Sequence, residues 1–255
     1  MYVQRFYRDW MGGTRLHRFQ VRRKESDLLI LCDAPLEAEA RRALCDVREA
    51  IEEYAKADPA FLTSLSPRRV PGEAPEVVRS MAEAGEAFGV GPMAAVAGAV
   101  AETVGRRLLE RAGTVVVENG GDVFARTDRP LRFALYAGEA SRFTGSVHFE
   151  VDARAGAGVC TSSGRVGPSY SAGRADAVAA VAASAGFADA AATAAANRIR
   201  GAADVEEAGR QEGFGHGAWD RLESLIAAAG DRIAFLGNVR LVPPPERRSA
   251  PCKRA

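Results

Sequence analysis

A strand that runs into a paired glycine turn is the feature that most limits how this chain can fold. Val115-Val116-Val117 is a run of β-branched residues, which favour strands, and Gly120-Gly121 follows it closely. Paired glycines adopt the positive φ angles of tight hairpin turns, so the segment predicts two antiparallel strands joined at residues 119–122. A helix over 92–112, which has proline in its first turn, is expected to lead into the first of these strands.

The remaining elements alternate and cluster in a way that is typical of α+β proteins. The alanine-rich stretch 176–197 is ambiguous, because alanine favours helix while 177–181 also suits a strand of small residues. Gly186 interrupts that stretch, so we expect a strand, a turn and then a helix. The other strands are expected over 15–21, 28–31, 123–124, 131–136, 146–151 and 232–241, and the helices over 35–56, 76–88, 187–199 and 218–228.

Length and charge restrict the class of protein. The chain has 255 residues, and we expect a single domain over 1–242 followed by a flexible basic tail over 243–255. Its 34 basic and 33 acidic residues leave a net charge of +1, so no overall field recruits nucleic acid or a membrane. No run is long and apolar enough to span a bilayer, and the first ten residues carry charges where a signal peptide needs an apolar run. We expect a cytoplasmic protein whose partner is a small molecule, and the small residues over 94–101 leave a homo-oligomer open.

The cysteines indicate no metal cluster. They form no CxxC pair and no cluster with histidine, which argues against a zinc site, an iron–sulfur site and a disulfide framework. Cys160 is expected to be a small buried residue and not a nucleophile. The four cysteines are Cys32, Cys45, Cys160 and Cys252.

Two segments offer groups that suit a phosphorylated ligand. In Asn119-Gly120-Gly121-Asp122 the glycines let a ligand approach the backbone, and Asp122 can hold a polar edge of that ligand. The same residues are also common in plain hairpin turns. In Thr161-Ser162-Ser163-Gly164 three hydroxyl groups suit phosphate or ring-edge hydrogen bonds, although Ser/Thr turns satisfy their own side chains.

A carboxylate and a hydroxyl on one helix face are the candidate cation ligands. Asp189 and Thr193 are four residues apart, and Mg²⁺ binds oxygen ligands while keeping waters or substrate phosphates in its shell. The alternative is that Asp189 lies in the first turn of its helix, where the helix dipole favours a carboxylate in any case. Asp122 and Asp176 leave two similar alternatives open. Each could hydrogen-bond a hydroxyl group of a ligand, and each could cap backbone amides.

In this order, these segments resemble those of the ApbE-like superfamily, whose best-known members are FAD:protein FMN transferases. Met11-Gly12-Gly13-Thr14 is similar to an early Met-Gly-Thr element of that family, with one extra glycine. Residues 92–122 are similar to its small-residue helix and Gly-Gly-Asp turn, 162–164 to its Ser-Gly element, and 188–193 to the Ala-Asp-Ala-x-x-Thr motif that carries its metal ligands. The resemblance extends over residues 11–197, and the last motif is the most specific.

The resemblance implies an α+β fold with a tunnel-fold-like antiparallel sheet core and packed helices. It implies FAD or FMN as the ligand and Asp189 and Thr193 as the ligands of Mg²⁺. Two family features have no counterpart, because 167–174 contains neither the His nor the Asp-Pro of the transferases, and 97–100 lacks their Lys. The chain therefore resembles the cytoplasmic branch of the superfamily whose activity is not established, and no general base can be assigned.

Three functions stay open from the sequence. The first is the binding of a flavin or another nucleotide diphosphate with the assistance of Mg²⁺. The second is a non-catalytic accessory role, for which the resemblance implies sulfur assimilation, since members of this branch have been associated with it. The third is a pteridine- or purine-binding tunnel-fold enzyme, in which a buried glutamate anchors the heterocycle. Glu118 is the candidate for that glutamate, although a glutamate at a strand end is more often solvated.

Overall fold

One large antiparallel sheet organises the chain, whose structure is described for residues 16–164, 173–206 and 217–244 of a computed structural model. The strand order is β1-β2-β3-β4-β7-β8-β9-β10, and each neighbouring pair runs antiparallel. A second sheet has the order β11-β6-β5. The strands are β1 His17–Arg23, β2 Ser26–Cys32, β3 Val115–Asn119, β4 Asp122–Arg126, β5 Leu131–Ala134, β6 His148–Val151, β7 Ala157–Ser162, β8 Ala177–Ala182, β9 Leu222–Ala229, β10 Arg232–Gly237 and β11 Arg240–Leu241.

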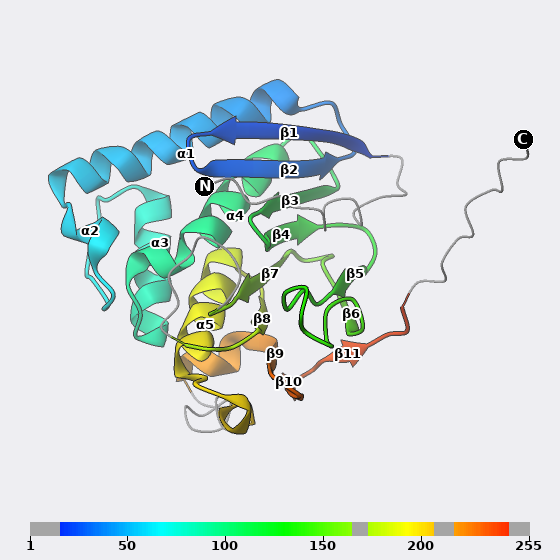
Figure 1. Cartoon of the computed structure of the whole chain (residues 1–255). Coiled ribbons are helices and arrows are strands. Elements are labelled where there is room, and N and C mark those ends of the chain that lie inside the picture. The colour runs from blue at the N-terminus through cyan, green and yellow to red at the C-terminus, as the bar shows by residue number, and fades with distance from the viewer. Residues whose placement is uncertain (1–15, 165–172, 207–216, 245–255) are drawn as a thin grey trace, which may run out of the picture.

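The helices cover one face of the large sheet and the small sheet lies on the other face (Figure 1). Among the described residues no single helix is long and apolar enough to cross a membrane, although α3 and the segment 92–108 meet that test together as a pair bent by 105°. The α-helices are α1 Glu37–Ala57, α2 Ala60–Thr63, α3 Glu76–Phe88, α4 Val96–Leu108 and α5 Ala185–Arg198. Short 3-10 helices are η2 Pro92–Ala95, η3 Ala202–Asp204 and η4 Gly217–Arg221.

Alternation along the strands produces two separate cores. In β3, Val115 and Val117 pack beneath the helices, whereas Val116 packs beneath the small sheet. In β9, Leu225 faces the helices and Ile226 faces the small sheet. Because successive side chains of a strand point to opposite faces, a strand that is covered on both sides is apolar throughout. This is why the valine run of β3 is continuous.

The large sheet contains the same topology twice. In the first half, β1 and β2 precede the helices α1 to α4, and β3 and β4 follow them. In the second half, β7 and β8 precede α5, and β9 and β10 follow it. The strands on either side of each helical connection pair directly with one another, and β5 and β6 are inserted between the halves. The sequence showed no repeat, because the two helical connections differ greatly in length.

The expectation of mixed helices with an antiparallel sheet is confirmed, and so is the hairpin at 119–122. Asn119 pairs with Asp122, and Gly120 and Gly121 have φ angles of 72° and 108°. Some expectations concern residues outside the described part of the chain. These are the element 11–14, most of the loop 167–174, and the tail beyond residue 244.

The helix expected over 218–228 is wrong. Residues 217–221 form a 3-10 helix, and 222–229 form β9, which is paired with β8 on one side and β10 on the other. Alanine at 227–229 favours helix locally, but a place between two strands buries both faces of the segment and satisfies its backbone. Tertiary pairing therefore outweighs the local preference.

Two helix boundaries also differ from expectation. The helix expected to run to residue 112 ends at Leu108, and the amides of Gly113 and Thr114 donate to the carboxylate of Asp33 at 3.2 and 3.0 Å. Helix α5 starts at Ala185 and not at 187, so Gly186 lies inside its first turn and does not break it.

Glycines allow α5 to begin between α4 and β7. A Cβ at Gly98 of α4 would lie 2.2 Å from the carbonyl oxygen of Ala185, and one at Gly158 of β7 would lie 2.3 Å from the Cα of Ala185. Both neighbouring atoms belong to the backbone and cannot rotate away. The first residue of α5 is therefore held between a helix and a strand that each lack a side chain at the contact.

We expect Gly158→Ala to destabilise the protein by about 1–3 kcal/mol, because the added methyl group overpacks the contact with Ala185. Gly72→Ala is the control, since a Cβ there meets no atom within 4 Å and the change should stay within about 0.5 kcal/mol. Urea unfolding of both variants measures the difference. Equal free energies of unfolding would contradict the close approach of β7 and α5.

Candidate functional site

Four segments meet at one end of the large sheet. They are the β3–β4 turn at 119–122, the end of β7, the first turn of α4 and the beginning of α5. Val123 pairs with Val159, which places Asp122 beside the last residues of β7. The helices α4 and α5 contact one another and also contact β4 and β7. The fold therefore brings together most of the segments that the sequence singled out.

Asp189 is buried where α5 crosses the start of α4. Only 8% of its surface is exposed, and its Oδ2 accepts a hydrogen bond from the backbone N–H of Gly98 at 3.0 Å. Gly98 is the third residue of α4, so its amide is one of those that have no acceptor within an isolated α-helix. Asp189 is the fifth residue of α5 and lies beyond its first turn, contrary to expectation. The carboxylate thus caps the neighbouring helix and not its own.

Three ionisable side chains influence one another at this point. Burial, and next the charge of Asp122, raise the pKa of Asp189 well above its usual range, while the amides of Gly98 and Ala97 act in the opposite direction. Burial, together with both aspartate charges, also raises the pKa of the Cys160 thiol. The contacts agree with this, because Asp122 lies beside the end of β7, which contains Cys160, and the Cys160 thiol contacts the Ala185 carbonyl one turn before Asp189 in α5.

The Cys160 thiol is buried, as the sequence predicts, and its Sγ donates to the carbonyl oxygen of Ala185 at 3.2 Å. Asp122 accepts a hydrogen bond from the backbone N–H of Thr161 at 3.0 Å. Asp176 accepts one from the N–H of Gly230 at 2.8 Å. For both aspartates, the structure shows the capping of backbone amides that the sequence left as one of two alternatives.

The β3–β4 turn is braced from both faces of the sheet. On the helix side, the side chain of Asn119 donates from Nδ2 to the carbonyl oxygen of Ala97 at 3.1 Å. Glu118 precedes Asn119 and by alternation lies on the opposite face, where its Oε1 accepts from the N–H of Gly121 at 2.8 Å. Glu118 is 1% exposed, so this glutamate at a strand end is not solvated.

The segment 161–164 divides between the two faces. Thr161 pairs with Ala179, which faces the small sheet, so its side chain lies away from Asp189. Ser162 alternates to the helix side and is buried. The Ser163 hydroxyl and the Gly164 amide both donate to the carbonyl oxygen of Ala175, at 3.4 and 3.0 Å. The site therefore brings Asn119, Asp122, Ser162 and Asp189 to one face and excludes the Thr161 side chain from it.

Glu102 belongs to this assembly, although the sequence analysis did not single it out. Its Oε2 accepts from the Ser184 hydroxyl and the Ala185 amide, both at 2.7 Å, and from the Gly186 amide at 3.4 Å. These partners lie 82 to 84 residues further along the chain. No local pattern marks a residue that caps a helix so distant in sequence.

The donor atoms here suit a cation that a bound ligand also coordinates. Within the described ranges, no three His, Cys, Asp or Glu side chains gather so that they could hold a metal ion by themselves. The charge of Asp122 acts on Asp189, and Thr193 lies one turn further along α5 on the same helix face. Carboxylate and hydroxyl oxygens suit Mg²⁺, whose shell is commonly completed by water or phosphate.

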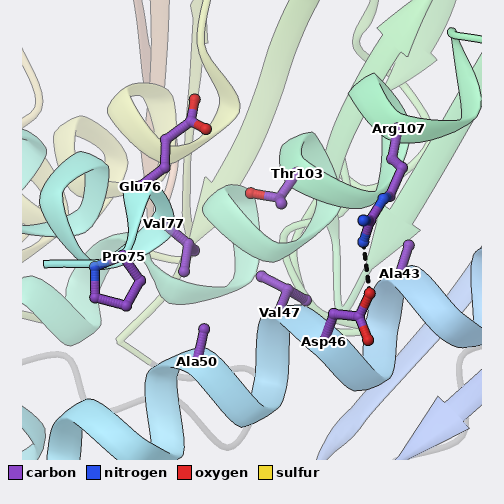
Figure 2. Close-up of a pocket in the computed structure, with 9 residues that line it drawn as sticks. All are labelled: Ala43, Asp46, Val47, Ala50, Pro75, Glu76, Val77, Thr103 and Arg107. Carbon is purple, nitrogen blue, oxygen red and sulfur yellow. Dashed lines mark hydrogen bonds and ion pairs between the residues drawn. The ribbon is translucent and has the colours of Figure 1, made fainter.

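A separate surface pocket of about 190 Å³ lies between α1, α3 and α4 (Figure 2). Ala43, Val47 and Val77 contribute apolar walls, and Asp46 and Arg107 form an ion pair at 2.6 Å beside them. None of its lining residues belongs to the four segments described above. The pocket therefore does not extend the candidate site.

Comparison with known sequences identifies relatives along most of the chain. The profile of a family described as AbpE bacteria matches residues 8–211. The UPF0280 protein of Methanopyrus kandleri is 40% identical over 218 residues, which are 84% of this chain and 88% of that protein. The UPF0280 protein of Methanocaldococcus jannaschii is 38% identical over 220 residues, which are 85% of this chain and 88% of that protein.

Comparison with solved structures supports the fold. The apo flavinyl transferase ApbE of Pseudomonas stutzeri superposes with a TM-score of 0.56 at 13% identity, over 88% of this chain and 94% of the other. The ApbE protein of Thermotoga maritima gives a TM-score of 0.52 at 11% identity, over 88% of this chain and 97% of that protein. At these identities the similarity establishes a shared fold and not a shared ligand.

We expect Asp189→Ala to destabilise the protein by about 1–3 kcal/mol, because it leaves the buried Gly98 amide without its acceptor. Asp189→Asn keeps an oxygen at that position and removes the charge from beside Asp122, so it should stay close to the wild type. Urea unfolding without added ligand distinguishes the two variants. Equal losses in both would show that the contact with the Gly98 amide contributes nothing to stability.

Proposed function

This chain belongs to the AbpE bacterial family, and on that premise we propose that it binds a flavin nucleotide or a similar diphosphate with the assistance of Mg²⁺. The resemblance of its motifs to those of the FAD:protein FMN transferases points to this class of ligand. The name of the Pseudomonas stutzeri protein, a flavinyl transferase with the same fold, supports it.

The observation that carries the proposal is the meeting of Asp122 and Asp189 beside the Gly120-Gly121 turn and the start of α4. Both carboxylates are buried, and burial followed by the charge of Asp122 raises the pKa of Asp189. Two neighbouring buried carboxylates are costly unless a cation or a proton lies with them. A divalent cation bound with a diphosphate would balance this charge.

The proposed roles follow from the placement of each group. Asp189 and Thr193 would hold the cation, and Asp122 would position a polar edge of the ligand. At Gly120 and Gly121 the absence of a side chain would let the ligand approach the turn next to Asn119, although the Gly121 N–H itself donates to Glu118. Ser162 would add a hydroxyl group, whereas the Ser163 hydroxyl and the Gly164 amide already donate to the carbonyl oxygen of Ala175. The Thr161 side chain faces the other side of the sheet. A bound Mg²⁺ supplies Lewis-acid polarisation of a diphosphate.

A pteridine- or purine-binding tunnel-fold enzyme is the second candidate function. The observation that favours it is Glu118, which is buried as such a role requires. Its carboxylate braces the β3–β4 turn through Gly121, and it lies on the face of the sheet away from Asp189. A heterocycle anchored by Glu118 would therefore occupy a different site from a ligand at Asp189, which makes the two candidates separable by mutation.

We expect FAD, FMN or ADP to raise the melting temperature only in the presence of Mg²⁺. At a ligand concentration of 100 Kd the stabilisation is about 2.7 kcal/mol, which corresponds to roughly 5–10 °C for a chain of this size. Thermal-shift titrations of the whole protein with each nucleotide, with and without Mg²⁺, measure it. Asp189→Asn, which keeps the fold, should lose the Mg²⁺-dependent part of the shift.

The matched control is Asp152→Asn, which removes an exposed carboxylate paired with Arg154 outside the site and should shift like the wild type. A shift with pterins that is lost in Glu118→Gln and kept in Asp189→Asn would favour the second candidate function. No shift with any nucleotide or pterin would contradict both. It would favour the accessory role in cytoplasmic sulfur assimilation, to which the missing His and Asp-Pro of 167–174 also points, and a partner pull-down would follow.

A further inference from the structure

The N-terminus of α5 is capped by a carboxylate of another helix. Glu102 of α4 accepts hydrogen bonds from the amides of Ala185 and Gly186, the first two residues of α5. The Ser184 hydroxyl donates to Glu102 and accepts from the amide of Phe187, the third residue, at 3.3 Å. The amides that begin an α-helix have no acceptor within it, so Glu102 and Ser184 together satisfy the first three.

Glu102 is held in place on its other side. Its Oε1 accepts from Nη2 and Nε of Arg106, one turn further along α4, at 2.7 and 2.9 Å. The Glu102 side chain is only 12% exposed, whereas that of Arg106 is 61% exposed. A mostly buried carboxylate that uses both oxygens has little freedom to move. The amides at the start of α5 therefore occupy fixed positions relative to α4.

The contacts of Glu102 and Asp189 are reciprocal. Gly98 and Glu102 are one turn apart on α4, and Ala185 and Asp189 are one turn apart on α5, so each pair shares a helix face. The Glu102 carboxylate of α4 takes the Ala185 amide, and the Asp189 carboxylate of α5 takes the Gly98 amide. Each helix thus caps the other, and a displacement of one contact moves the residues that form the second.

We propose that Glu102 is a positioning residue for the Asp189 carboxylate, acting through the first turn of α5. This inference rests on the proposed cation and diphosphate site. Glu102 does not touch the ligand. It fixes the turn of α5 from which Asp189 projects, so its loss displaces a cation ligand without removing it.

The test measures the affinity of Mn²⁺ for the whole protein in the presence of ADP, by isothermal titration calorimetry, together with the melting temperature. Glu102→Ala should weaken Mn²⁺ binding by about tenfold or more, as is common when a group that supports a metal ligand is removed. Glu102→Gln keeps one oxygen acceptor for the α5 amides but loses the acceptor for Arg106, so it should lose clearly less affinity than Glu102→Ala.

Val47→Ala is the matched control, because it removes buried methyl groups from α1, outside the contact of α4 with α5. It should lower the melting temperature while leaving the Mn²⁺ affinity unchanged. If Glu102→Ala does not fold, Glu102→Asp decides the question, since it keeps the charge but is one methylene too short to reach the α5 amides, and it should weaken binding.

An affinity for Mn²⁺ that is unchanged in Glu102→Ala, or in Glu102→Asp where the alanine variant does not fold, would overturn the positioning role. Equal losses in Glu102→Ala and Val47→Ala would overturn it as well, because they would trace the effect to stability alone. An absence of binding in the wild type would instead contradict the proposed function, and the positioning role with it. Failure of the positioning role therefore appears as unchanged binding in the Glu102 variants, and failure of the proposed function appears as absent binding in the wild type.

Discussion

The close contact of α4 with α5 is the interaction on which the rest of the site depends. Two glycines, Gly98 and Gly158, leave room for the backbone of Ala185 between a helix and a strand. At that distance carboxylates of each helix reach the free amides of the other, through Asp189 and Glu102. Buried carboxylates are tolerated in proteins when they accept such hydrogen bonds. The packing of small residues thus brings the buried carboxylates within hydrogen-bonding distance of those amides, and the hydrogen bonds offset the free-energy cost of burial.

The sequence predicted elements well where a local pattern coincides with the tertiary environment. The valine run of β3, the Gly120-Gly121 turn and the helix α1 each have a period or a turn signal that the fold confirms. Residues 222–229 do not, because their alanines favour helix while pairing with two strands makes them β9. The twofold topology was also invisible, since it depends on pairings between distant strands and not on similar residues.

The candidate site was predictable in part for a related reason. Asp189 and the 119–122 turn stood out by local spacing and by the resemblance, and the structure brings them to one end of the sheet. Local spacing did not indicate which of Thr161 and Ser162 faces the helices, because that depends on how β7 is placed in the sheet and paired with β8. Glu102 carried no signal at all, since an acidic residue in an amphipathic helix is ordinarily a surface residue. Its role depends entirely on what packs against it.

The long separations within these contacts have a consequence for how the site forms. Gly98 and Asp189 are 91 residues apart, and Glu102 and Ala185 are 83 residues apart. Closing such long loops costs chain entropy before the contact returns any stabilisation, so non-local contacts form late in folding. Strands and helices of either half of the sheet can therefore appear before the site exists. Ligand binding at this position would report that both halves of the chain have completed their docking, and neither half alone contains the contact.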